Sequence, residues 1–185
     1  MNVAIIGGGI AGLASAISLK RIGLDPTVYE QRSEVHHLGA GVVCWPNATF
    51  VLNELGLLEE LQTVGWPISG MQRITCDGVP LGKLDIRKLD GAMGYPSLAV
   101  LRKDLMGLLL RHVNENGIRV HLSRRATRIV ACGDHSRIEF TNGTSITPDL
   151  ILGADGRMAS IAREYIRGDN RPVFQGFLNC LVYSI

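Results

Sequence analysis

Residues 2–12 read NVAIIGGGIAG, and this stretch decides the fold. Asn2–Ile6 is a short apolar run rich in β-branched residues, which predicts a buried strand of a parallel sheet. Ile10–Arg21 has apolar residues at helical spacing, and Gly23 is a natural end for that helix. Thr27–Glu30 predicts a second strand. A strand, a helix and a strand in this order form a β-α-β unit, which implies a parallel sheet.

A glycine pattern follows the first predicted strand. Gly7-Gly8-Gly9-Ile10-Ala11-Gly12 fits G-x-G-x-x-G, the pattern of a dinucleotide-binding turn. Gly7 suits the tight turn, Gly9 leaves room for a pyrophosphate, and Gly12 lets the helix pack closely on the strand. The first helical turn, which contains Ala11, offers N–H groups and a positive dipole end to the phosphates. The alternative is a structural glycine-rich turn without a ligand.

Glu30 ends the second predicted strand, 18 residues after Gly12. A carboxylate at this place can bind both ribose hydroxyls, and it repels a 2′-phosphate, so the site favours NAD or FAD over NADP. The rest of the chain favours FAD, because a hairpin region interrupts the fold where a simple NAD dehydrogenase would continue with β-α repeats. The alternative interpretation of Glu30 is a surface glutamate.

The remaining chain contains predicted strands, helices and turns, without repeats or a linker between domains. Strands are predicted at 68–86, as a hairpin around Asp77-Gly78, and at 97–101, 118–122, 126–131, 137–141 and 150–154, with a turn at Asn142-Gly143. Helices are predicted at 46–61 (broken near Gly56), 103–115 and 158–166, a loop at 31–44, and an extended apolar segment at 173–185. These elements predict an α/β fold: a Rossmann-like FAD/NAD(P)-binding domain with a parallel sheet, helices and a β-meander.

The composition excludes several classes of protein. With 185 residues, 46% hydrophobic and 19% charged, and a net charge of +2, the chain can form one globular core and is not disordered. It has no basic block of the kind that binds nucleic acid and no apolar run long enough to span a membrane. It also lacks the basic region that precedes the first apolar stretch of a secretory signal. We therefore expect a cytoplasmic protein with reduced thiols and without nucleic-acid, membrane or metal binding. The four cysteines are widely spaced: Cys44, Cys76, Cys132 and Cys180.

Four motifs together carry a resemblance to a known family. They are the glycine pattern ending in Glu30-Gln31-Arg32, Gly39-Ala40-Gly41-Val42 with Trp45-Pro46-Asn47, Leu101-Arg102-Lys103-Asp104-Leu105, and Leu152-Gly153-Ala154-Asp155-Gly156. With these motifs the chain resembles the N-terminal half of the single-component FAD-dependent aromatic hydroxylases, the para-hydroxybenzoate hydroxylase class. Within that class it is most similar to salicylate, 6-hydroxynicotinate and urate hydroxylases. The resemblance covers nearly all 185 residues.

The resemblance implies FAD as the cofactor and assigns residues near the glycine pattern to it. Glu30 would hold the adenosine ribose, with Gln31 and Arg32 beside it. The backbone near Gln31 and Val43 would lie along the cofactor. Glu30 and Arg102 are both expected to act on the cofactor and not on the fold.

The resemblance also implies cofactor contacts from later parts of the chain. Arg102 would reach the phosphate and ribityl region, and the main chain of Ala126 would meet the adenine. Asp155-Gly156 would form a second fingerprint, tied both to FAD and to the visiting NADH or NADPH. Plainer alternatives exist for two of these residues: Arg102 as a solvated arginine that pairs with Asp104, and Asp155 as a helix N-cap.

The sequence departs from the family pattern at two places. The family has Ser four and Arg seven residues after the aspartate, where this chain has Ala159 and Ala162; Ser160 and Arg163 each come one residue later, and neither is assigned a role. The family's Gly-Asp fingerprint, which holds the flavin side of FAD, has no match in the chain. Most residues of the substrate cavity are also expected beyond Ile185.

The resemblance implies an FAD-dependent, NAD(P)H-consuming monooxygenase that hydroxylates an aromatic or heteroaromatic small molecule with O2, present here as an N-terminal FAD-binding portion. No catalytic residue is assigned. One alternative is an FAD-dependent reductase or dehydrogenase without oxygen insertion, and another is a truncated, non-catalytic flavin-binding remnant. The expected domains are an FAD-binding domain at 1–171, with a β insertion at about 67–100, and the truncated start of a substrate-binding domain at 172–185. The last segment is expected to be the first strand of an antiparallel sheet, through which the chain self-associates.

Overall fold

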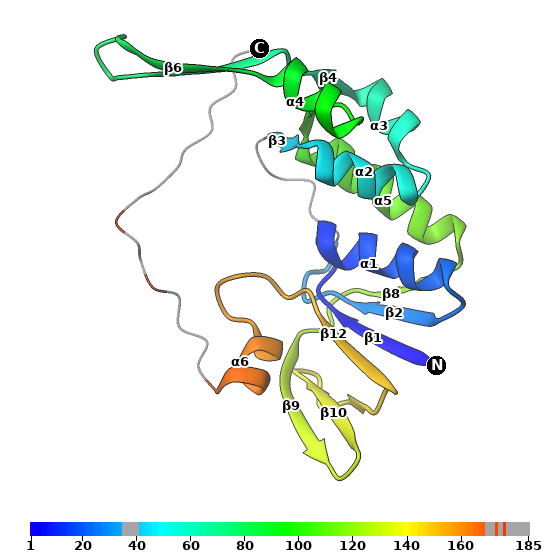
Figure 1. The fold of residues 1–185 in the computed structure, drawn as a ribbon. Helices are drawn as coiled ribbons and strands as arrows, with labels where there is room; N and C mark the ends of the chain where they lie inside the picture. Colours follow the sequence, from blue (N-terminus) through cyan, green and yellow to red (C-terminus); the bar gives the residue numbers. More distant parts are fainter. Residues whose placement is uncertain (35–40, 169–172, 174–175, 177–185) are drawn as a thin grey trace. The chain divides into compact units, whose positions relative to one another are not determined.

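The computed structural model describes residues 1–34, 41–168, 173 and 176. The chain divides into two compact units, one containing residues 1–34 with 109–168 and the other residues 41–108. The first unit contains a parallel sheet, a three-stranded antiparallel sheet and helices (Figure 1). The predicted α/β fold with a parallel sheet and a β-meander is confirmed. The predicted strand at 172–185 lies outside the described residues, except for residues 173 and 176.

The parallel sheet has the strand order β12-β1-β2-β8. Its strands are β1 (Asn2–Ile6), β2 (Asp25–Tyr29), β8 (Arg119–His121) and β12 (Leu150–Gly153). β1 lies in the middle, where Ile5 pairs with Val28 on one side and with Leu152 on the other. The apolar run of β1 is buried because strands flank it on both edges.

Helix α1 (Ile10–Arg21) connects β1 to β2 and has the bounds that the sequence predicts. Leu13, Ala16 and Ile17 are buried at helical spacing, so one face of α1 packs into the core. Gly23, with a φ of 82°, follows the helix end in the left-handed conformation that glycine favours.

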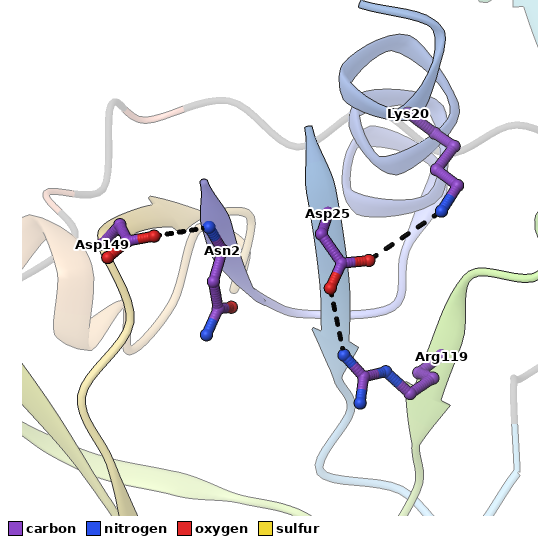
Figure 2. A network of polar contacts seen from close by, with 5 residues as sticks. All are labelled: Asn2, Lys20, Asp25, Arg119 and Asp149. Atoms are coloured by element: carbon purple, nitrogen blue, oxygen red, sulfur yellow. Dashed lines mark hydrogen bonds and ion pairs between the residues drawn. The ribbon is translucent and has the colours of Figure 1, made fainter. Parts of the chain in front are cut away.

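Polar contacts connect the amino ends of the strands (Figure 2). The backbone N–H of Asn2 donates to Asp149 Oδ2 at 2.6 Å and so joins the starts of β1 and β12. The carboxylate of Asp25 lies 3.8 Å from Lys20 Nζ and accepts a hydrogen bond from the Arg119 guanidinium at 3.2 Å. These side chains are largely exposed, so each ion pair contributes at most about 1 kcal/mol. Their effect is to align the strand starts.

A second sheet packs on the first through apolar side chains. It consists of β9 (Ala126–Cys132), β10 (His135–Phe140) and β11 (Ser145–Ile146), joined as antiparallel neighbours. The shared core also takes in α6 (Ile161–Arg167) and contains Ala4, Ile6, Ile129, Ile138, Phe140 and Ala162. This core supports the strand ends that carry the site described below.

The second unit is built on the antiparallel sheet β3-β7-β4. Its strands are β3 (Gly41–Cys44), β7 (Leu98–Leu101) and β4 (Gly65–Pro67), and α2 (Pro46–Glu54) and α3 (Leu58–Val64) lie between them in sequence. The prediction of a loop at 31–44 is wrong for its last four residues, because Gly41–Cys44 pairs with β7. The predicted break of the helix at 46–61 is confirmed, since Gly56 has a φ of 73° between α2 and α3.

The predicted hairpin around Asp77-Gly78 is confirmed as β5 (Gly70–Ile74) and β6 (Pro80–Asp85). A helix that the sequence did not predict follows, α4 (Ile86–Met93), whose N-cap Asp85 accepts a hydrogen bond from Arg87 N at 3.1 Å. The last helix of this region is α5 (Arg102–Glu115), which begins one residue before its predicted start.

Candidate functional site

The parallel sheet has a topological switch point between β1 and β12. From β1 the chain order of the strands runs outward through β2 to β8, whereas β12 lies on the opposite side. In open α/β sheets, ligands bind outside the carboxyl ends of the strands at such a point. The connections are tight here, because Gly7 N donates to Tyr29 O at 2.9 Å and Ala154 N donates to Ile6 O at 2.8 Å.

At this switch point, Gly7 and Gly12 let neighbouring backbone segments lie very close to each other. Gly7 has a φ of 109°, and a Cβ atom on it would collide with the backbone of Ala154 and Asp155. A Cβ atom on Gly12 would collide with the carbonyl of Gly7. Both glycines therefore have the geometry that the sequence pattern requires, a tight turn and a close contact between helix and strand.

Gly9 differs from these two glycines because it faces open space. It is the N-cap of α1, no side chain caps the helix, and no acidic residue lies in the first turn. A Cβ atom on Gly9 would meet no atom within 4 Å. The first N–H groups of a helix have no partner within the helix, so this end of α1 can bind an anion such as a pyrophosphate.

Glu30 is joined to the glycine turn by its carboxylate. Its Oε2 accepts a hydrogen bond from Gly8 N at 2.7 Å, and its Oε1 accepts one from Arg32 N at 3.0 Å. Each carboxylate oxygen has a second lone pair, so the group can still accept ribose hydroxyls. Glu30 also accepts hydrogen bonds from two backbone N–H groups, so we expect its loss to affect the stability of the turn as well as cofactor binding. The fixed carboxylate and the open end of α1 together fit the adenosine-diphosphate part of a dinucleotide.

The loop after β8 supports the segment around Glu30. Arg124 N donates to Glu30 O and Ser123 N to Arg32 O, both at 2.8 Å. Ser123 has a φ of 55°, an uncommon conformation for a residue other than glycine. Ala126 begins β9 shortly after this loop. The sequence carried no signal for these contacts, because they join residues about 90 positions apart.

Asp155 binds the start of α6. Ser160 Oγ donates to Asp155 Oδ1 at 2.6 Å, and Ala162 N donates to Asp155 Oδ2 at 3.3 Å. The N-cap is Ser160, whose Oγ accepts a hydrogen bond from Arg163 N at 3.0 Å. The predicted helix start at 158 is therefore wrong, and so is the alternative in which Asp155 is the N-cap. The later start gives Ser160 a structural role that the sequence left unassigned.

Arg163 also holds the loop that follows Asp155. Its guanidinium donates to Gly156 O at 2.8 Å and to Arg157 O at 3.0 Å. Gly156 has a φ of 88°, a conformation that strains other residues. The one-residue shift from the family pattern thus leaves a connected network between Asp155, Ser160 and Arg163.

Ser160→Ala tests this network. The variant loses the N-cap acceptor and the donor to Asp155, so we expect its free energy of unfolding to fall by about 1–2 kcal/mol. Urea unfolding of the chain measures the change, with Ser145→Ala, in which no cap is removed, as the control. Equal stability of the two variants would contradict a capping role for Ser160.

Two predicted cofactor residues belong to the second unit. Val43 lies in β3 opposite Ala99 of β7. Arg102 is the first residue of α5 and is exposed. The other predicted residues (Gly7, Gly9, Ala11, Gly12, Glu30, Gln31, Arg32, Ala126, Asp155 and Gly156) belong to the first unit.

The described residues show few other reactive groups. Cys44 is buried, and burial raises the pKa of its thiol, so the group remains a protonated, weak nucleophile at neutral pH. Within the described ranges, no group of three or more His, Cys, Asp or Glu residues could hold a metal ion. Among the described helices, none has the length and apolar character needed to cross a membrane.

Comparisons with known proteins agree with this geometry. The sequence model of the FAD binding domain family matches residues 1–183. The FAD-dependent urate hydroxylase of Mycolicibacterium vanbaalenii is 31% identical over 183 residues, covering 97% of this chain and 46% of that protein. The 3-amino-4-hydroxybenzoate 2-monooxygenase PtmB3 of Streptomyces platensis is 35% identical over 177 residues, covering 95% of this chain and 44% of that protein.

The chain is also similar to a solved structure that contains FAD. The crystal structure of Klebsiella pneumoniae HpxO complexed with FAD and uric acid superimposes with a TM-score of 0.76 at 30% identity, covering 89% of this chain and 41% of that one. The chain spans less than half the length of these relatives. It belongs to the FAD binding domain family.

Proposed function

We propose that the chain is the FAD-binding part of a monooxygenase that hydroxylates an aromatic or heteroaromatic small molecule, with NADH or NADPH as the reductant and O2 as the second substrate. The observation that carries this proposal is the site at the carboxyl ends of β1 and β2. There an uncapped helix end lies beside a carboxylate that Gly8 N fixes at 2.7 Å. Relatives named as urate hydroxylase and aminohydroxybenzoate monooxygenase support the choice of substrate class.

The proposed binding of FAD divides the work among backbone and side chains. Gly7 and Gly12 shape the turn, while the N–H groups near Gly9 and Ala11 bind the pyrophosphate. Glu30 accepts hydrogen bonds from the adenosine ribose, and an acid is better suited to a ribose without a 2′-phosphate.

Residues of both units are proposed to make the remaining contacts with FAD. Gln31, Arg32 and the main chain of Ala126 serve the adenosine end, and Asp155-Gly156 contributes backbone near the phosphates. Val43 and Arg102 contribute from the second unit. When bound, FAD supplies the redox chemistry, while the protein binds, orients and shields it.

We also propose the wider setting of this chain. The FAD-binding domain covers 1–171 with a β insertion at about 67–100, and 172–185 begins a substrate-binding domain. An apolar strand with an open edge recruits a second copy, so we propose self-association through 172–185. Cys44, Cys76 and Cys132 are free thiols, which supports a cytoplasmic location.

Binding of FAD in place of NAD is the first expected result. FAD at about 100 times its Kd should stabilise the chain by about 2.7 kcal/mol and raise its Tm, because only the folded state binds it. NAD at the same concentration should leave the Tm unchanged. Thermal unfolding followed by circular dichroism measures both. A Tm that rises with NAD and not with FAD would contradict the proposal.

Oxygen chemistry is the second expected result. The 185-residue chain, loaded with FAD and given NADH and urate, should consume O2 and release about one H2O2 per NADH without hydroxylated product. The reason is that a site open to water loses activated oxygen as peroxide. An oxygen electrode with a peroxidase-coupled assay measures the ratio. Coupled hydroxylation by this chain would show that it closes a site by itself. Reduction of the bound FAD by one equivalent of NADH, with no O2 consumed afterwards, would favour a reductase.

A further inference from the structure

The chain contains two Asn-Gly dipeptides, Asn116-Gly117 and Asn142-Gly143, and the candidate FAD site uses neither. Asn-Gly is prone to spontaneous deamidation, because asparagine is a thermolabile residue and the following glycine has no side chain that shields its backbone nitrogen. Both dipeptides are exposed to solvent, so exposure does not distinguish them. Their hydrogen bonds, in contrast, differ.

Deamidation of Asn-Gly needs water as its only co-reactant. The backbone nitrogen of the glycine loses its proton and attacks Cγ of the asparagine side chain. The side-chain nitrogen leaves as ammonia, and a succinimide ring remains. Water then opens the ring at one of its two carbonyl groups and gives aspartate or β-linked isoaspartate. Negative charge develops on the side-chain oxygen of the asparagine while the new bond forms, so groups that stabilise this charge accelerate the reaction.

Asn142-Gly143 lies in the turn between β10 and β11, and two donors bind the side-chain oxygen of Asn142. Asn142 Oδ1 accepts a hydrogen bond from Thr144 Oγ1 at 2.7 Å and another from Thr144 N at 3.3 Å. Thr144 is itself held in place, because Phe140 N donates to Thr144 O at 3.0 Å. The two donors are therefore fixed on the oxygen that gains negative charge, as in an oxyanion hole.

The attacking group in this turn is Gly143 N. It donates to Phe140 O at 3.0 Å, and this bond must open before the nitrogen can reach Cγ of Asn142. Residues 141–145 are all exposed, and Gly143 has a φ of 78°. Hydrogen bonds at an exposed turn open at a low cost in free energy, and glycine has the conformational freedom to rotate toward the side chain.

Asn116-Gly117 is held differently, at the end of α5. Asn116 N and Asn116 Nδ2 both donate to His112 O, at 3.1 and 2.8 Å. The next residue, Ile118, donates its N–H to Val113 O at 3.0 Å, and the side chains of Ile118 and Val113 are buried. The amide of Asn116 is thus tied to the helix through its nitrogen, and its reaction requires the end of a packed helix to unwind.

We infer that Asn142 is a site of spontaneous deamidation in the folded chain, that Thr144 accelerates the reaction as a positioning residue, and that Asn116 is protected. The product has a carboxylate in place of a neutral amide, so each event lowers the net charge of +2 by one. The inference does not depend on the cofactor, because the reaction needs only the turn and water. A failure of FAD binding would leave it unaffected.

Peptide mapping of the folded 185-residue chain tests the inference. After incubation in mildly alkaline buffer below the Tm, trypsin releases Asn116 in the peptide 112–119 and Asn142 in the peptide 138–157. Fragmentation mass spectrometry then measures, over time, the replacement of each side-chain amide by a carboxylate. We expect the folded chain to lose Asn142 at least about tenfold faster than Asn116. In urea, where both segments are unfolded, the two rates should become similar.

Two variants test the role of the Thr144 hydroxyl group. Thr144→Ala removes the donor at 2.7 Å and should slow the deamidation of Asn142 at least about threefold, whereas Thr144→Ser keeps a hydroxyl and should retain the wild-type rate. Thr63→Ala, at an exposed threonine of α3, is the matched control and should change nothing. Equal rates at Asn142 and Asn116 in the folded chain would overturn the inference. So would a Thr144→Ala variant that loses Asn142 as fast as the wild-type chain or faster.

Discussion

Gly12→Ala is expected to lower the free energy of unfolding by at least about 2 kcal/mol. The added Cβ would collide with the carbonyl of Gly7, a backbone atom that cannot rotate away, and overpacking of this kind costs about 1–3 kcal/mol or more. The gain in helix propensity from alanine, about 1 kcal/mol, offsets only part of this cost. Urea unfolding of the chain without FAD measures the loss.

Gly107→Ala is the matched control for Gly12→Ala. Gly107 lies within α5, and a Cβ atom there would meet nothing within 4 Å, so stability should stay equal or rise. Gly9→Ala gives the complementary test. Its Cβ also meets nothing, so the fold should keep its stability while FAD binding weakens, because the methyl group enters the space proposed for the pyrophosphate. Full stability of Gly12→Ala would show that the turn relaxes easily.

Glu30→Ala is expected to weaken FAD binding by about ten- to a hundredfold, the effect of losing charge-assisted hydrogen bonds to the ribose. It should also destabilise the apo chain by about 1–2 kcal/mol, because the N–H groups of Gly8 and Arg32 lose their acceptor. FAD titration by fluorescence and urea unfolding separate the two effects.

Glu30→Gln distinguishes the two roles of this side chain. The amide keeps one acceptor oxygen for Gly8 N but loses the charge, so stability should recover more than FAD affinity does. Glu59→Gln, an exposed carboxylate of α3, is the control and should change neither quantity. If Glu30→Gln and Glu30→Ala bound FAD as tightly as the wild-type chain, the ribose contact would be ruled out.

The sequence predicts best the elements whose signals lie close together along the chain. β1 and α1 have the predicted bounds, because an apolar run, a glycine turn and helical spacing all lie within 20 residues. β3 was missed because Gly41–Cys44 becomes a strand only by pairing with β7, far along the chain. α6 was placed too early because Met158 and Ala159 favour helices, whereas the cap formed by Ser160 with Asp155 decides the start.

Part of the candidate site could likewise be predicted from the sequence, and part could not. The glycine turn and Glu30 follow from spacing alone, since a β-α-β unit brings them to one edge of the sheet. The second role of Glu30, as the hydrogen-bond acceptor for Gly8 N, is seen only in the structure. The same holds for Arg163, whose contacts with Gly156 and Arg157 arise from a loop conformation that no periodic pattern encodes.

The central position of β1 has a consequence for synthesis of the chain. β1 leaves the ribosome early, but its neighbour β12 follows much later, as the 147-residue separation of Asn2 and Asp149 shows. Until then one edge of an apolar strand has no native partner, and non-local pairing of this kind slows folding. The nascent chain thus exposes an aggregation-prone edge until β12 has been made, and we expect chaperones that bind apolar segments to raise its yield.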